Sequence, residues 1–396
     1  MSLDTLDRVR AGRGSLERCT GNPRSFLEHD WGKRAAVRLG GPPGFEDLLS
    51  LDDVDRFLTS SALRTPFFRL VKVGEQIQES SYTRSGRTGS REFSGIADPA
   101  RVAALFEDGA TIVLQGLHRW SEPVARFCRD LELDLGHPCQ VNAYITPPGA
   151  QGLDLHEDAH DVFVLQAFGR KHWEVHSAPH EETRDPLRVE VTSGATIYMP
   201  TGTPHAARAQ DVLSGHLTVG VHVTPWREVL SGVVGRALEG IEDPVAAGWT
   251  EDLEGFAEEL RRRLAALASA LGEVDVRTEA GERRERFLSN RGQLARGTIV
   301  ERSTPISVDD ATVVARRPGA VCELAVRTDR LLVLLGDRRL EMPTWVERAM
   351  RRVAGLDENA ELTVGELAPD LPAAADRAVL VRRLIREGLL TIRGGR

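Results

Sequence analysis

Two histidines and three carboxylates are crowded into the segment HEDAHD, residues 156–161, which runs directly into the apolar stretch VFVLQAF. Alternate side chains of an extended strand share one face, so His156 and Asp158 are expected to point together while Glu157 points away. One imidazole beside one carboxylate supplies only two ligands for a metal ion. A further ligand must then come from another strand.

His205 is the expected third ligand. It ends the segment GATIYMPTGTPH, residues 194–205, in which a strand and a Pro/Gly turn aim the histidine back at the mouth of the predicted barrel. Two histidines and one carboxylate on one face leave three open positions, an arrangement typical of Fe(II) sites that also hold a cosubstrate and O₂. A structural zinc site would be closed and would usually use cysteine.

Other histidines offer alternatives. His160 and Asp161 could be the ligands instead, although adjacent strand residues face opposite ways, and His205 could be an ordinary loop histidine. His216 and His222 share one face of the run HLTVGVHV and stay candidates for a pocket. The histidines in and after the strand GRKHWEVH are predicted to be surface or pocket-rim residues: His172, His176 and His180.

Lys171 is one of only three lysines in 396 residues, and it follows a strongly apolar run. A buried cation facing an Fe(II) site favours an anion, and the distal carboxylate of 2-oxoglutarate fits that need. A solvent-exposed lysine is the simpler alternative.

Composition narrows the class of protein. A net charge of −8 disfavours broad contact with nucleic acid. The four cysteines form no CxxC pair, which argues against a zinc ribbon, an iron–sulfur site and a disulfide scaffold. There is no secretory signal pattern and no apolar run of about 18 residues. The expected protein is a cytoplasmic enzyme or binding protein without membrane contact.

Short β-branched runs separated by Gly, Pro and Asp turns predict an antiparallel sandwich or barrel. The predicted strands are 110–115, 140–146, 161–168, 172–176, 188–192, 195–200 and 216–224. One helix, 122–133, lies between the first two. The first 110 residues are mixed, with a Gly/Ser/Arg loop at 81–95.

After Pro225 the sequence has helical periodicity at 226–240 and 251–272. The second of these helices carries one apolar stripe: Phe256, Leu260, Leu264 and Leu267. Such a stripe indicates either an oligomer surface or a surface that packs on the helices' own domain. The sequence favours neither interpretation.

The last 70 residues follow a winged-helix pattern. A strand-turn-strand candidate at 330–343 precedes three helical segments and the closing strand LLTIR. This fold can bind DNA or serve as a protein-contact module. Frequent acidic residues around the helix at 376–387 disfavour nucleic-acid binding by its basic residues: Arg377, Arg382, Arg383 and Arg386.

The segments NAYITPPGAQGLDLHEDAHDVFVLQAFGRKHWEVH and GATIYMPTGTPHAARA resemble the JmjC-type ribosomal oxygenases, which are cupin-like Fe(II)/2-oxoglutarate hydroxylases of ribosomal proteins. The similarity extends over most of the chain, since FLEHDWGKRAAVR resembles the family's opening helix and strand. The motifs that carry the resemblance lie in the central block.

The resemblance implies roles for individual residues. His156, Asp158 and His205 match the iron ligands, and Lys171 matches the residue that binds the 2-oxoglutarate carboxylate. Further matches within the cosubstrate pocket are Asn142, Tyr144 and Thr218. Gly220 departs from the family, because many relatives have a serine there near the cosubstrate. The rim residues Glu157, His160 and Asp161 have no assigned role.

The implied fold is α+β. A double-stranded β-helix (jelly-roll, cupin, JmjC) core in residues 1–225, with strands at about 95–225, precedes a helical dimerisation region at 226–320 and a winged-helix domain at 321–396. The implied protein is a homodimeric dioxygenase that uses Fe(II), 2-oxoglutarate and O₂ to hydroxylate an arginine or histidine side chain of a ribosomal protein.

Four alternatives remain open at this point. The same chemistry could act on a precursor peptide or a small metabolite of a biosynthetic pathway. It could end in N-demethylation, with release of formaldehyde. The chain could be a non-catalytic cupin that binds a ligand or partner, which the intact ligand set makes least attractive. It could also be a DNA-binding regulator that uses the last domain.

Overall fold

The computed structural model describes residues 14–41, 44–150, 154–209, 211–292, 306–357 and 360–393, together with residues 299 and 303. The chain divides into two compact units, residues 1–223 and 224–396. Within the described residues, no helix has both the length and the apolar character needed to cross a membrane. The predicted three-domain division stays a prediction.

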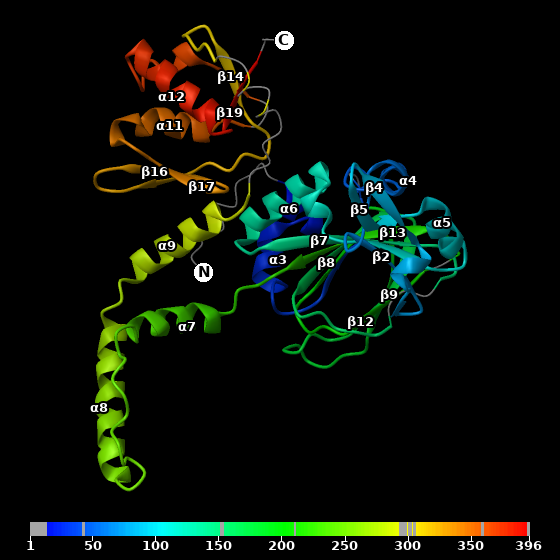
Figure 1. Cartoon of the computed structure of the whole chain (residues 1–396), viewed down its shortest axis with the longest axis horizontal. Helices are drawn as coiled ribbons and strands as arrows, with labels where there is room; N and C mark the ends of the chain where they lie inside the picture. Colours follow the sequence, from blue (N-terminus) through cyan, green and yellow to red (C-terminus); the bar gives the residue numbers. More distant parts are fainter. Residues whose placement is uncertain are drawn as a thin grey trace. The chain divides into compact units, whose positions relative to one another are not determined.

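The first unit contains two antiparallel sheets. The larger has the order β1-β11-β8-β13-β7-β6-β2-β3, and the smaller has the order β10-β9-β12. The strands of the larger sheet are β1 (Ala36–Arg38), β2 (Phe68–Lys72), β3 (Glu75–Gln76), β6 (Thr111–Leu114), β7 (Cys139–Thr146), β8 (Asp161–Phe168), β11 (Thr196–Met199) and β13 (Ser214–Val221). Those of the smaller are β9 (Arg170–Val175), β10 (Leu187–Thr192) and β12 (His205–Ala209). Figure 1 shows β9 and β12 opposite β7, β8 and β13.

Both faces of the larger sheet are covered, which explains its nearly continuous apolar runs. On β8, Phe163 and Leu165 pack into the main core with residues of the N-terminal helices. Val162 and Val164 face the other way, toward the smaller sheet and its pocket. The helices of this unit are α2 (Ser15–Thr20), α3 (Pro23–His29), α4 (Leu51–Ser60), α5 (Pro99–Glu107) and α6 (Glu122–Leu135).

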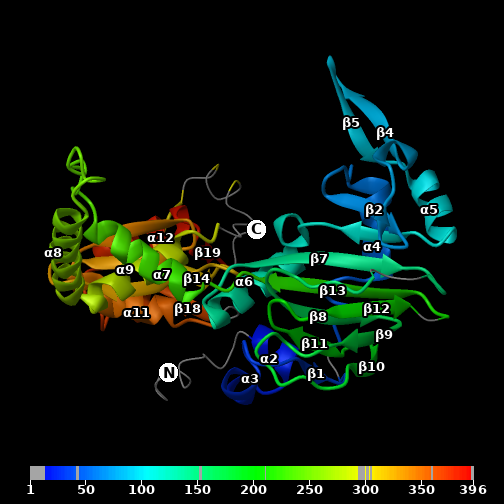
Figure 2. The same cartoon turned by 90° about the horizontal axis from the view of Figure 1, so that it is seen from below.

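Two parts of the first unit differ from the sequence prediction. The expected loop at 81–95 is a hairpin of β4 (Thr83–Thr88) and β5 (Arg91–Ala97), which projects from the unit in Figure 2. The hairpin packs against the unit only at its base, where the buried Tyr82 contacts Phe68. Its strands therefore lack the alternating apolar pattern from which strands are predicted. β12 was not predicted, because HAARA is poor in the β-branched and aromatic residues that favour strands.

The second unit begins with three helices, α7 (Trp226–Ala237), α8 (Leu253–Gly272) and α9 (Val276–Ser289). No residue of α7 or α8 is buried. Part of the region predicted to be helical, residues 293–298, lies outside the described residues.

The rest of the second unit encloses its own core. Its strands form the sheets β18-β14-β19 and β15-β16-β17. The elements are β14 (Val313–Arg316), β15 (Glu323–Val326), β16 (Leu331–Leu335), β17 (Arg338–Met342), α11 (Glu347–Ala354), β18 (Glu361–Thr363), α12 (Ala374–Arg386) and β19 (Leu390–Ile392). Arg377 is not part of a surface basic patch, since it is buried and pairs with Asp310.

Candidate metal centre

His156 and His205 meet through their backbones. The His156 N–H donates to the His205 carbonyl (3.1 Å), and the His205 N–H donates to the His156 carbonyl (2.8 Å). His205 is the first residue of β12, whereas His156 and Asp158 precede β8, which begins only at Asp161. The expectation that His156 and Asp158 lie on the strand itself was therefore wrong. His156 instead forms an isolated β-bridge with His205.

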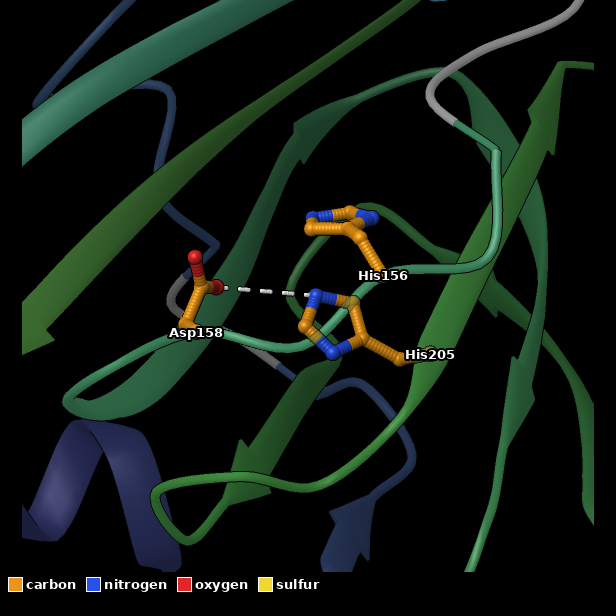
Figure 3. Close-up of side chains that lie close together, drawn as sticks. All are labelled: His156, Asp158 and His205. Carbon is orange, nitrogen blue, oxygen red and sulfur yellow. Dashed lines mark ion pairs between the residues drawn. The ribbon is translucent and has the colours of Figure 1, made fainter.

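The side chains of His156, Asp158 and His205 converge, as Figure 3 shows. Three possible ligand atoms, one from each residue, lie within 4.8 Å of one another. His205 Nε2 is 3.6 Å from Asp158 Oδ2, and the two imidazole centroids are 4.4 Å apart. Two nitrogens and one oxygen gathered on one side could hold a divalent ion with adjacent positions open.

Hydrogen bonds orient both imidazoles. The Nδ1–H of His156 donates to the Asp154 carbonyl, and the Nδ1–H of His205 donates to the Thr203 carbonyl, each at 2.8 Å. Because a carbonyl only accepts, each ring keeps its Nε2 lone pair free for a metal. Burial also lowers the pKa of His205, which keeps this ring neutral, as a ligand must be.

Asp161 is neither a metal ligand nor a rim residue. It is buried, and its carboxylate accepts hydrogen bonds from the Tyr198 hydroxyl and from the Thr201 N–H (2.8 Å) and hydroxyl (2.7 Å). The same turn is tied to the second candidate ligand, since the Gly202 N–H donates to the Asp158 carbonyl (2.9 Å). Asp161 thus fixes the turn from which His205 emerges.

Lys171 is fully buried, one strand over from β8 along the chain, where the sequence predicted it to face the site. Its Nζ donates to Thr146 Oγ1 (2.9 Å) and lies 3.3 Å from His216 Nδ1. Burial lowers the pKa of Lys171 to about 7, and burial together with Lys171 holds the pKa of His216 well below its usual value. No carboxylate is among these partners, so an anionic ligand would supply the missing counter-charge.

One pocket contains the three candidate metal ligands, Lys171, and the predicted cosubstrate residues Asn142, Tyr144 and Thr218. It encloses about 780 Å³ of space, part of it open to solvent. Asn142 also has a structural contact, because its Oδ1 accepts the Gly116 N–H (3.0 Å). Tyr144 stacks on His216 with ring centroids 5.1 Å apart.

Several residues that line the pocket were not singled out from the sequence, among them Thr146 and Trp173. Thr146 lies two positions beyond Tyr144 on β7, and that period-two spacing was the available signal. Trp173, two positions after Lys171, is buried against the rings of His205 and His216, and its Nε1 has no hydrogen-bond partner in the described structure.

The remaining histidines separate as follows. His216 lies inside the pocket, but His222 is exposed beyond the end of β13. His172 and His180 are exposed and His176 is half-buried, as expected for surface or rim residues. Glu157 is exposed.

Gly220 contacts His160 instead of the Lys171 end of the pocket. A Cβ at position 220 would lie 2.8 Å from the His160 ring. His160 lines the pocket, and His222 packs against it with ring centroids 5.2 Å apart.

Known proteins share sequence and fold with this chain. A family model described as "JmjC domain" matches residues 118–229. The chain is 27% identical over 225 residues to a bifunctional lysine-specific demethylase and histidyl-hydroxylase NO66 of Dictyostelium discoideum, covering 52% of this chain and 42% of the relative. It is 30% identical over 243 residues to ribosomal oxygenase 1 of Rattus norvegicus, covering 56% and 39%. The chain thus spans about two fifths of the length of these curated relatives.

A solved structure matches nearly the whole chain. The Escherichia coli ribosomal oxygenase YcfD, in complex with cobalt and 2-oxoglutarate, superposes with a TM-score of 0.54 at 20% identity, covering 94% of this chain and 98% of that one. At this identity the likeness shows the fold, which is cupin-like with mixed helices and strands. Residues 118–229 therefore match the JmjC domain model, and the predicted resemblance to the ribosomal oxygenases is confirmed.

Proposed function

We propose that the protein is an Fe(II)- and 2-oxoglutarate-dependent oxygenase that hydroxylates an arginine or histidine side chain of a ribosomal protein. The observation that carries the proposal is one pocket holding the cluster of His156, Asp158 and His205 and also the buried cation Lys171. The names of the relatives and the cobalt and 2-oxoglutarate in the YcfD structure support it.

The donor set fits both groups. Two imidazoles with free Nε2 atoms and one carboxylate suit Fe(II) with open coordination positions. The Lys171 ammonium and the unpartnered Trp173 Nε1–H are buried donors that suit a carboxylate. When bound, iron and 2-oxoglutarate supply the oxidation, in which O₂ and 2-oxoglutarate give succinate, CO₂ and a hydroxylated substrate.

The residues of the chain bind, orient and exclude water. His156, Asp158 and His205 hold the metal, with Asp161 fixing the turn before His205. Lys171 binds the distal carboxylate of the cosubstrate, and Tyr144, Asn142 and Thr218 bound the same space. Val162, Val164 and Trp173 make the walls apolar, which keeps competing water out.

Succinate formation from 2-oxoglutarate with anaerobically loaded Fe(II) tests the proposal. Turnover that needs His156 and Asp158 and rises with a ribosomal protein extract is the expected result. Turnover without that rise would redirect the substrate to a precursor peptide or a metabolite. A bound metal without any turnover would leave a binding protein. Because one relative is named a demethylase, formaldehyde should be measured in the same reactions.

The homodimer is a further part of the proposal. Within α7, α8 and the segment between them, large apolar side chains are exposed: Trp226, Leu230, Leu238, Ile241, Val245, Trp249, Leu253, Leu260 and Leu264. A second copy of the chain would cover such a surface. Sedimentation of the full chain should give a dimer, and a monomer at micromolar concentration would remove this part.

The three-domain division is proposed as well, with boundaries near 225 and 320 and a winged-helix unit at the end. Its role would be protein contact. Arg377 is buried in an ion pair and Arg383 pairs with Glu387, which leaves α12 a weak surface for DNA phosphates. A DNA gel shift abolished by Arg382→Glu with Arg383→Glu would contradict this.

A further inference from the structure

The β4–β5 hairpin carries positive charge that its surroundings do not neutralise. It projects from the first unit (Figure 2), and Arg84, Arg87 and Arg91 are exposed along it. Within the part of the chain that the structure describes, these three side chains have no ion pair and no hydrogen bond. The hairpin has one carboxylate, Glu92, which lies opposite Arg87 in the strand register but forms no ion pair with it in the described structure. The guanidinium groups are therefore available to an external anion.

Other exposed helices pair their arginines with carboxylates, as α8 shows. Arg261 pairs with Glu258, and both Arg262 (2.6 Å) and Arg263 (2.8 Å) pair with Glu259. The arginine-rich composition of the chain therefore does not by itself produce an unneutralised patch. A net charge of −8 disfavours broad contact with polyanions, but the local excess of arginine on the hairpin still attracts them.

The outer part of the hairpin, residues 84–91, contains only arginine, serine, threonine and glycine. Opposite residues of an antiparallel pair share a face, so Arg91 lies on the face of Thr88 and Arg87 lies on the other face. This part has no apolar side chain to insert into a membrane or to fill the pockets of a bound peptide strand. Guanidinium, hydroxyl and backbone N–H groups are instead the groups that contact the phosphates of nucleic acids.

The base of the hairpin connects this charge to the pocket. Ile96 forms a backbone bridge with Arg64, whose guanidinium lies 5.9 Å from the centre of the Phe93 ring. Further along the same segment, the Arg69 side chain donates a hydrogen bond to the Tyr144 hydroxyl, and Tyr144 lines the pocket. One short segment of chain thus contacts both the hairpin and a pocket residue.

We propose that the β4–β5 hairpin binds RNA, with Arg84, Arg87 and Arg91 contacting the phosphate backbone. Binding is independent of base sequence, because Phe93 is half-buried beside Arg64 and leaves the hairpin without an exposed aromatic ring for base stacking. The choice of RNA over DNA rests on the proposed function, since a ribosomal protein substrate is bound to RNA in the ribosome. The hairpin would then hold the RNA that accompanies the substrate.

Fluorescence anisotropy tests this binding with the full chain and a labelled single-stranded RNA of mixed sequence. We expect a Kd on the order of 10 μM at about 0.15 M salt, within the range of sequence-independent binding. Three phosphate contacts predict that the logarithm of the affinity falls with the logarithm of the salt concentration with a slope of about −2. RNAs of different base composition should bind with similar affinity. No binding at this salt concentration, or tighter binding of polyglutamate than of RNA, overturns the proposal.

Matched variants test whether the hairpin is the binding surface. Arg87→Gln with Arg91→Gln should weaken binding about tenfold and reduce the slope to about −0.7, because one phosphate contact remains. Arg87→Lys with Arg91→Lys keeps the charge and should keep the slope. Arg34→Gln with Arg188→Gln removes the same charge from two exposed arginines that pair with carboxylates, and it should leave binding unchanged. Wild-type binding by the first variant, or an equal loss in the last, overturns the proposal.

Succinate formation with a ribosomal protein extract separates this proposal from the proposed function. Ribonuclease treatment of the extract should raise the amount needed for half-maximal turnover severalfold for the wild type, and not for Arg87→Gln with Arg91→Gln. Wild-type turnover that ribonuclease leaves unchanged, or that responds to deoxyribonuclease instead, overturns RNA as the partner. Absence of succinate under every condition, with RNA binding intact, would overturn the proposed function alone.

Discussion

The metal cluster and the Lys171 end of the same pocket are built by different forces. At the cluster, all three candidate ligands belong to loops or strand termini, and hydrogen bonds to backbone groups set the positions of His156, Asp158 and His205. At the other end, Lys171 lies inside a strand-walled space, where burial lowers its pKa to about 7. Metal binding at the cluster depends on the geometry of the ligands, so a small displacement should abolish it. Ligand binding at the Lys171 end depends on a desolvated charge, so it should respond to charge and pH.

Removing a ligand should have the largest effect. Asp158→Ala leaves two imidazoles to hold the metal, and 2-oxoglutarate turnover is expected to fall by about a thousandfold or more. Turnover and bound iron are measured together. Glu157→Ala is the matched control, because this neighbouring carboxylate is exposed and should leave both quantities unchanged. Iron retained at wild-type affinity in Asp158→Ala would exclude the cluster as the metal site.

Neutralising the buried cation should affect the cosubstrate and spare the metal. Lys171→Met keeps the length and the apolar stem, and the affinity for 2-oxoglutarate is expected to fall about a hundredfold through loss of a buried charge partner. Calorimetric titration of the metal-loaded protein measures this. An unchanged 2-oxoglutarate affinity would separate Lys171 from the cosubstrate.

Loosening the turn before His205 tests whether the geometry of the ligands determines the metal affinity of the cluster. Asp161→Asn keeps the shape of the side chain, but its NH₂ group can only donate. The amide therefore cannot accept hydrogen bonds from both Tyr198 and Thr201, as the carboxylate does. Metal affinity is expected to fall about tenfold, as for other residues that support ligands. Competition with a chelator of known affinity gives the value. Ser193→Ala, a hydroxyl on a neighbouring turn that donates to the Ala167 carbonyl, provides a control for general loosening.

The pH response tests the desolvated end. An anion raises the pKa of Lys171 above its ligand-free value of about 7, so cosubstrate affinity is complete below pH 7 and declines as pH rises. The decline is expected to be at most about tenfold per pH unit between pH 7 and the raised pKa. Titrations from pH 6 to 9 measure it, and Lys171→Met should give a flat profile over this range. A wild-type profile equally flat would contradict the assignment.

Sequence patterns were sufficient for the parts of the molecule governed by local propensity. β-branched runs gave most strands of the larger sheet, and residue types with spacing identified His156, Asp158, His205 and Lys171 as members of one site. Parts held by tertiary contacts were missed. β12 is alanine-rich and exists through pairing with β9, and Asp161 gains its role only from Tyr198 and Thr201, which are distant in sequence.

The double backbone bridge between His156 and His205 has a consequence for the order of assembly. The bridge closes a loop of about fifty residues before any metal binds. The entropy lost on closing this loop is therefore part of the free energy of folding and not of metal binding. The metal then binds ligands that already lie side by side, and its binding further stabilises the closed loop. Amide hydrogen exchange at these two positions would therefore be slow in the metal-free protein and slower still after loading, which makes it a direct reporter of metal occupancy.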